Sequence, residues 1–155
     1  MRLIRYADTY LEVSDFIVEN DLWPYDMPLD SWPTYCGAGE GLGDYVVPDN
    51  IFGVNISPAC FQHDIEYAVN NRNWLAFVAA NRRLRGNIIM LTDAHLQGVQ
   101  RVEAWAIAEE YFLAVMAFGW PNFTPDATDW RQSKIVKEKL HRLAMHNLQF
   151  AAVRA

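Results

Sequence analysis

The stretch from Asn20 to Ser57 constrains this chain of 155 residues most, because it cannot form a continuous helix. Prolines and glycines recur through it, at Pro24, Pro28, Pro33, Pro48, Gly37, Gly39, Gly41, Gly43 and Gly53. Proline removes a backbone donor and clashes with the preceding helical turn, and glycine weakens a helix. A loop of this length is uncommon in a compact domain and is usually functional. We therefore expect ligand contacts in this segment.

On both sides of the loop, apolar residues recur at helical spacing. Before it, the pattern predicts an amphipathic helix over residues 7–20, with Asp8 as its cap. After it, Ser57 followed by Pro58 is a typical helix start, and that helix should run to about Asn70. Further helices are predicted from Trp74 through Leu91, from Asp93 to Phe118 with a bend near Gly98, and from Asp129 to Val153.

The predicted fold class is mainly α. No segment shows convincing strand-like alternation, although Tyr45–Val47 could form one short strand. The chain contains neither an internal repeat nor a domain boundary, so residues 1–155 are expected to form a single domain.

Composition narrows the range of partners. The net charge is −6 and no cluster of Lys and Arg is long enough to follow a phosphate backbone, which argues against nucleic acid. Aromatic residues make up 14% of the chain, more than a core needs, and exposed aromatics suit a membrane interface. The start of the chain soon becomes polar and does not resemble a secretory signal. The count of two cysteines, Cys36 and Cys60, leaves free thiols and a disulfide equally open.

The helix that begins at Pro58 carries a cluster of reactive residue types. Cys60, His63 and Tyr67 are three and four residues apart and therefore share one helical face, and Asp64 follows His63 directly. A His-Asp pair alone says little, because a buried histidine with satisfied hydrogen bonds is the ordinary explanation.

The glycine-rich loop upstream, Tyr35–Gly43, changes the interpretation of that pair. Glycines at alternating positions allow the backbone to turn its carbonyl oxygens inward, where a hard cation can bind several of them. Carbonyl oxygens carry no net negative charge, which the Asp64 carboxylate would supply. A glycine-rich surface loop without a ligand is the alternative.

Together, Tyr35–Gly39 and Pro58–Tyr67 resemble the calcium loop and catalytic helix of the phospholipase A2 superfamily. The lead-in at residues 52–60 is similar to the bacterial and fungal branch, and the compact spacing to the viral capsid branch. The resemblance covers about residues 34–90 and leaves out the N-terminal helix, about 7–20, and the C-terminal helical part, about 93–153. It implies a pair of antiparallel helices with a long calcium-binding loop and additional C-terminal helices, and a disulfide between the two cysteines.

The resemblance also implies a role for each matching residue. Carbonyl oxygens of Tyr35, Gly37 and Gly39 and the Asp64 carboxylate would bind Ca²⁺. The ion, with the Gly37 backbone N–H, would stabilise the oxyanion formed on the sn-2 ester carbonyl. His63 would be the general base that takes a proton from the attacking water. The predicted function is calcium-dependent hydrolysis of the sn-2 ester of glycerophospholipids at a membrane surface or micelle.

One position departs from the family pattern. In the phospholipase A2 superfamily, an Asp on the next helix orients the catalytic histidine. A tyrosine holds that Asp, and Tyr67 matches this tyrosine in the present chain. Counting from the turn between the two helices brings His63 level with Asn81 instead. An Asn carbonyl can accept the imidazole N–H, but it cannot stabilise the imidazolium electrostatically. Asp93 is the alternative partner, if the helix breaks near Gly86.

Because of Asn81, a second hypothesis stays open: a catalytically weak or inactive phospholipase-like module that binds lipid or an unknown protein partner. A disulfide and phospholipid substrates would both suit an extracytoplasmic or secreted protein, exported without a recognisable signal peptide.

Overall fold

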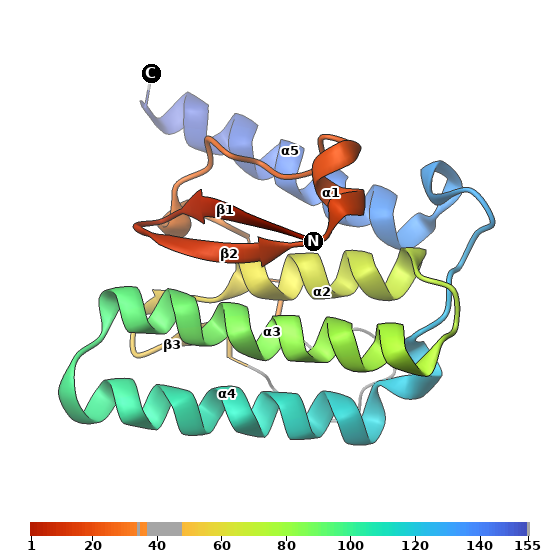
Figure 1. Ribbon diagram of the computed structural model, residues 1–155. Helices are drawn as coiled ribbons and strands as arrows, with labels where there is room; N and C mark the ends of the chain where they lie inside the picture. Colours follow the sequence, from red (N-terminus) through yellow and green to blue (C-terminus); the bar gives the residue numbers. More distant parts are fainter. Residues whose placement is uncertain (34, 37–47, 155) are drawn as a thin grey trace.

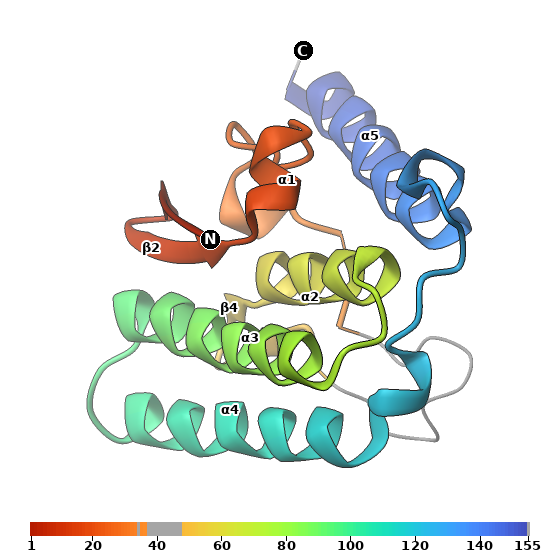
Figure 2. The ribbon, with the colours of Figure 1, turned by 45° about the vertical axis from the view of Figure 1, so that its right-hand side comes forward.

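The computed structural model describes residues 1–33, 35–36 and 48–154, and this part of the chain is mainly α-helical, as predicted. Helix α3 lies between α2 and α4, and the N-terminal hairpin and α5 lie on the other side of α2 from α4 (Figures 1 and 2). The α-helices are α1 (Asp15–Glu19), α2 (Ser57–Val69), α3 (Trp74–His95), α4 (Gly98–Phe118) and α5 (Lys134–Arg154). Short 3-10 turns are η1 (Leu29–Ser31), η2 (Trp120–Asn122) and η3 (Trp130–Gln132). No helix in the described residues is both long enough and apolar enough to cross a membrane.

The two central helices begin at the residues that the sequence predicts. Helix α2 starts with Ser57 and Pro58 in its first turn, although Ser57 is its first helical residue rather than its cap. Helix α3 starts after Asn73, whose side-chain oxygen accepts the N–H groups of Leu75 and Ala76. It passes through Gly86 without a break and ends at His95, four residues beyond the predicted end at Leu91.

The prediction of a helix over residues 7–20 is wrong for its first half. Strands β1 (Arg2–Tyr6) and β2 (Thr9–Val13) form an antiparallel hairpin, and α1 begins only at Asp15. Ala7 and Asp8 both have positive φ, 49° and 62°, as the tight turn of a two-residue hairpin requires. Asp8 is therefore a turn residue and not a helix cap. Along both strands, burial alternates with a period of two residues, as expected for strands with one face on the core. The buried side chains are Ile4, Tyr6, Leu11 and Val13.

Asn87 attaches the hairpin to α3. Its side-chain oxygen accepts the backbone N–H of Glu12 at 2.8 Å, and its amide nitrogen donates to the Glu12 carbonyl at 2.9 Å. The side chain thus pairs both backbone groups of one strand residue on the edge that β1 does not cover.

The loop before α2 is tied to the core by packing and by a covalent bond. Aromatic rings from the hairpin, the loop and α2 pack edge to face or tilted: Tyr6, Trp23, Trp32, Tyr35 and Phe61. A disulfide joins Cys36 to Cys60, as the resemblance implies. Strands β3 (Asn50–Ile51) and β4 (Val54–Asn55) form a second short hairpin that leads into α2. The strand predicted at Tyr45–Val47 lies outside the described residues.

The C-terminal helix α5 begins at Lys134, five residues later than predicted, because its polar caps lie just before that residue. The Asp126 carboxylate accepts the backbone N–H groups of Lys134 and Ile135, and the Ser133 hydroxyl accepts that of Val136. Burial opposes ionisation of Asp126, but these bonds and the Ser133 hydroxyl hold its pKa below the ordinary value.

Candidate active site on helices α2 and α3

His63 and Asn81 face each other across α2 and α3. The distance from His63 Nε2 to Asn81 Oδ1 is 2.8 Å, and both residues are buried. Counting from the turn therefore located this pair correctly. Asp93 does not contact the histidine; its carboxylate accepts hydrogen bonds from Arg101 and Trp105.

The surroundings of Asn81 fix which way its amide points. Oδ1 also accepts the Tyr67 hydroxyl at 2.6 Å, and Nδ2 lies 3.2 Å from Met116 Sδ. A thioether sulfur can only accept, so the NH₂ end of the amide belongs there and the oxygen faces the imidazole. Burial raises the pKa of Tyr67 above its ordinary value, which keeps its hydroxyl protonated and donating.

This arrangement selects one tautomer of His63. Since Asn81 offers an oxygen, Nε2 carries the hydrogen and Nδ1 keeps its lone pair. Nδ1 lies 3.8 Å from Asp64 Oδ1, beyond direct hydrogen-bonding distance. The basic nitrogen therefore faces the half-buried Asp64 carboxylate, on the side away from Asn81.

The Asp64 carboxylate already has a cationic neighbour that the sequence did not reveal. Lys139, from α5, donates from Nζ to Asp64 Oδ2 at 2.6 Å. Burial opposes ionisation of Asp64, but the positive charge and the hydrogen bond of Lys139 lower the pKa of the carboxyl. Asp64 is therefore negatively charged at neutral pH.

The residues described here partly cover the predicted calcium ligands. Tyr35 and Asp64 are described, whereas Gly37 and Gly39 lie outside the described residues. Carboxylate and carbonyl oxygens are the ligands that Ca²⁺ prefers, and Asp64 and Tyr35 supply oxygens of these two types. In this structure the Asp64 carboxylate is paired with the Lys139 ammonium. Within the described residues, no three or more His, Cys, Asp or Glu side chains gather into a metal-binding group.

The end of α4 supports the tyrosine that holds Asn81. A Cβ atom on Gly119 would lie 2.5 Å from the Tyr67 hydroxyl and 2.4 Å from the Val115 carbonyl oxygen, so only glycine allows this approach. Phe77 and Phe123 pack against the Tyr67 ring. The sequence did not reveal this role of Gly119, because nothing local to it signals that contact.

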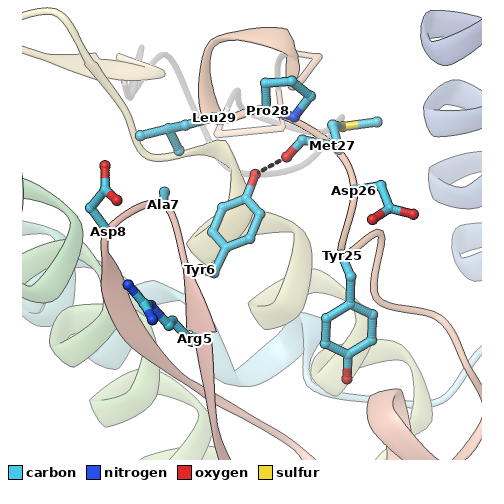
Figure 3. A pocket seen from close by; sticks show the side chains of 9 residues that line it. All are labelled: Arg5, Tyr6, Ala7, Asp8, Tyr25, Asp26, Met27, Pro28 and Leu29. Atoms are coloured by element: carbon cyan, nitrogen blue, oxygen red, sulfur yellow. Dashed lines mark hydrogen bonds between the residues drawn. The ribbon is translucent and has the colours of Figure 1, made fainter.

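Two cavities in the described residues lie away from this site. The larger, about 350 Å³, opens between the turn of the first hairpin and the loop at residues 25–29 (Figure 3). In it the Tyr6 hydroxyl donates to the Met27 carbonyl at 2.6 Å. The second, about 290 Å³, lies between residues 52–54, residues 29–30 and the end of α3. Neither is lined by a predicted site residue.

The candidate site therefore consists of His63, Tyr67 and Asn81 on one side and Asp64 with Lys139 on the other. The chain matches no protein-family model, no curated protein and no solved structure.

Proposed function

We propose that this protein hydrolyses the sn-2 ester of glycerophospholipids, with His63 as the general base. The observation that carries the proposal is the orientation of the imidazole. Asn81, which also accepts the Tyr67 hydroxyl, accepts Nε2–H of His63, and Nδ1 faces an ionised carboxylate at 3.8 Å. A base with a fixed tautomer beside a cation-binding carboxylate suits attack of water on an ester. It also agrees with the resemblance of Tyr35–Gly39 and Pro58–Tyr67 to the phospholipase A2 superfamily.

In the proposed reaction, a water beside Nδ1 gives its proton to His63 as its oxygen attacks the ester carbonyl. The Asn81 oxygen holds Nε2–H throughout, so the ring keeps its orientation. The same Nδ1 proton then passes to the glycerol oxygen as the ester bond breaks. When held by Asp64 and the carbonyls of Tyr35, Gly37 and Gly39, Ca²⁺ would supply electrophilic stabilisation of the developing oxyanion, with the Gly37 N–H assisting.

Exposed apolar side chains support a phospholipid surface as the partner. Trp74 and Leu75 open α3, Phe118 ends α4, and all three are exposed. The antiparallel packing of α3 and α4 brings these positions to the same end of the molecule (Figure 1). Trp74 also packs against Trp120, which lies beside the Phe77 and Phe123 rings that flank Tyr67. The disulfide supports an extracytoplasmic location, where such bonds persist.

A second candidate function is a phospholipase-like module that binds lipid or protein with little or no catalysis. The specific observation in its favour is Asn81, a neutral residue buried where the family pattern has a carboxylate. The imidazolium formed during proton transfer would then lack a charged partner.

Fatty-acid release from mixed phospholipid vesicles tests the proposal. His63→Ala should lower the rate of release by at least about 100-fold, since the general base is lost. His95→Ala is the matched control: this histidine is exposed at the end of α3, and its removal should leave the rate unchanged. Equal release by both variants would contradict the assignment of His63. Vesicle binding that survives His63→Ala, with no release by the unaltered protein, would favour the binding module.

A further inference from the structure

The ion pair between Lys139 and Asp64 joins residues 75 positions apart and brings a C-terminal helix to the predicted metal ligand. The lysine side chain is 16% exposed and the aspartate 30% exposed, so the pair is largely shielded from solvent. Attraction between opposite charges strengthens as water is excluded, and such a pair is screened less by salt. The ammonium is therefore a firmly held cation on the carboxylate.

Tyr35 fixes the backbone from which Lys139 extends. Its hydroxyl donates to the Lys139 carbonyl at 2.7 Å, and the ammonium lies 5.1 Å from the centroid of the same ring. Tyr35 is also the first residue of the predicted calcium loop. Tyr35 thus positions the backbone of Lys139. The flexible four-carbon stem of Lys139 lets its ammonium move away from Asp64 without a shift of the helix.

We propose that Lys139 is an internal competitor for the cation-binding site at Asp64. Oδ2 of Asp64 accepts the ammonium at 2.6 Å, so a divalent cation ligated by the same carboxylate would meet a like charge within a few ångströms. Repulsion at that distance opposes simultaneous binding. Calcium therefore binds only as the Lys139 side chain leaves, and the lysine weakens the apparent affinity of the site. This inference rests on the proposed function, because that function makes Asp64 a calcium ligand.

Calorimetric titration with calcium chloride, without any lipid, tests the competition. Lys139→Met keeps the apolar stem and removes the charge, and it should bind calcium at least about tenfold more tightly than the unaltered protein. Lys137→Met is the matched control, since this lysine is exposed on the same helix and its loss changes the net charge equally. It should bind calcium as the unaltered protein does.

A second variant tests whether the tighter calcium binding of Lys139→Met depends on Asp64. Adding Asp64→Asn to Lys139→Met should abolish the tighter binding, because the carboxylate is then gone. Thermal unfolding gives an independent readout: calcium should raise the melting temperature of Lys139→Met more than that of the Lys137→Met control. Calcium affinity of Lys139→Met equal to that of the control, or no calcium binding by it at all, would overturn the inference.

The test of the competition can be distinguished from the test of phospholipid hydrolysis. Tighter calcium binding by Lys139→Met without fatty-acid release by any variant would support the competition and contradict the proposed function. Release that depends on His63, together with unchanged calcium affinity in Lys139→Met, would overturn the competition and leave the proposed function standing.

Discussion

Asn81 accepts two hydrogen bonds on one oxygen, from His63 Nε2 at 2.8 Å and from the Tyr67 hydroxyl at 2.6 Å. Its amide geometry provides the orientation that a general base needs. It does not provide the negative charge that would stabilise the imidazolium, and in serine proteases the corresponding loss costs about 10⁴ in rate. In the proposed reaction, Asn81 would therefore orient the His63 base and would limit the stabilisation of its protonated form.

Asn81→Asp should raise the rate of fatty-acid release by about tenfold or more, because the carboxylate would stabilise the protonated imidazole. The initial rate measures this, and the same substitution in a His63→Ala background should bring no gain. We also expect a lower melting temperature, since the second carboxylate oxygen would face Met116 Sδ, which cannot donate. A lower rate in the single variant would show that Asn81 does not limit the base.

At the residue scale, the sequence predicted what lies within two helices and the turn between them. That His63 lies opposite Asn81 could be predicted by counting residues along α2 and α3, because the rise per residue of an α-helix is constant. The contact of Lys139 with Asp64 did not follow, because it depends on how α5 packs across 75 residues of chain. Nothing local distinguishes this lysine from Lys134 or Lys137 on the same helix.

The buried pair of Glu66 and Arg83 links α2 to α3 near the candidate site. Arg83 Nη2 lies 2.7 Å from Glu66 Oε1, and its Nε lies 2.9 Å from the same oxygen. Glu66 follows His63 by three residues and Arg83 follows Asn81 by two. The pair therefore holds the two helices at the register that brings the histidine to its partner.

Arg83→Met should lower the free energy of unfolding by about 3–5 kcal/mol, because it leaves the Glu66 carboxylate buried and unpaired. Urea denaturation followed by circular dichroism measures the change. Replacing both residues, as Glu66→Met with Arg83→Met, should recover much of the loss. A cost below about 1 kcal/mol for the single variant would mean that the pair does not hold the register.

The element that sequence reasoning missed is the N-terminal hairpin. Tyr10, Leu11, Val13, Phe16 and Ile17 approximate helical spacing, which concealed a strand followed by a short helix. Its turn, Ala7-Asp8, lacks the glycine that usually indicates a type I′ hairpin. Helices α2 and α3 were predicted well because Ser57-Pro58 marks the start of α2 and long apolar patterns run through both helices.

Across the whole molecule, the candidate site lies between the surface formed by Trp74, Leu75 and Phe118 and the C-terminal helix that carries Lys139. The apolar surface suits contact with lipid, and the helix supplies a cation to Asp64. In the proposed reaction at a membrane surface, the apolar residues would insert into the lipid. Lys139 would leave the Asp64 carboxylate so that calcium can bind there.

Leu75→Glu should weaken binding to phospholipid vesicles at least about tenfold, since burying a leucine side chain contributes about 1.5–3 kcal/mol. Vesicle sedimentation measures the affinity. Leu148→Glu is the matched control, because Leu148 on α5 is 65% exposed, close to the 77% of Leu75, and lies outside this surface. Equal losses in the two variants would indicate that this end of α3 does not meet the lipid.

We propose that His63, with a calcium ion at Asp64, hydrolyses the sn-2 ester. The most direct test is release of a fatty acid labelled at the sn-2 position of a phospholipid, measured with calcium and with excess chelator. We predict release of the labelled chain with calcium, and loss of that release with chelator or with His63→Ala. Release that persists in chelator or in His63→Ala would rule out this function, as would the absence of sn-2 release under every condition.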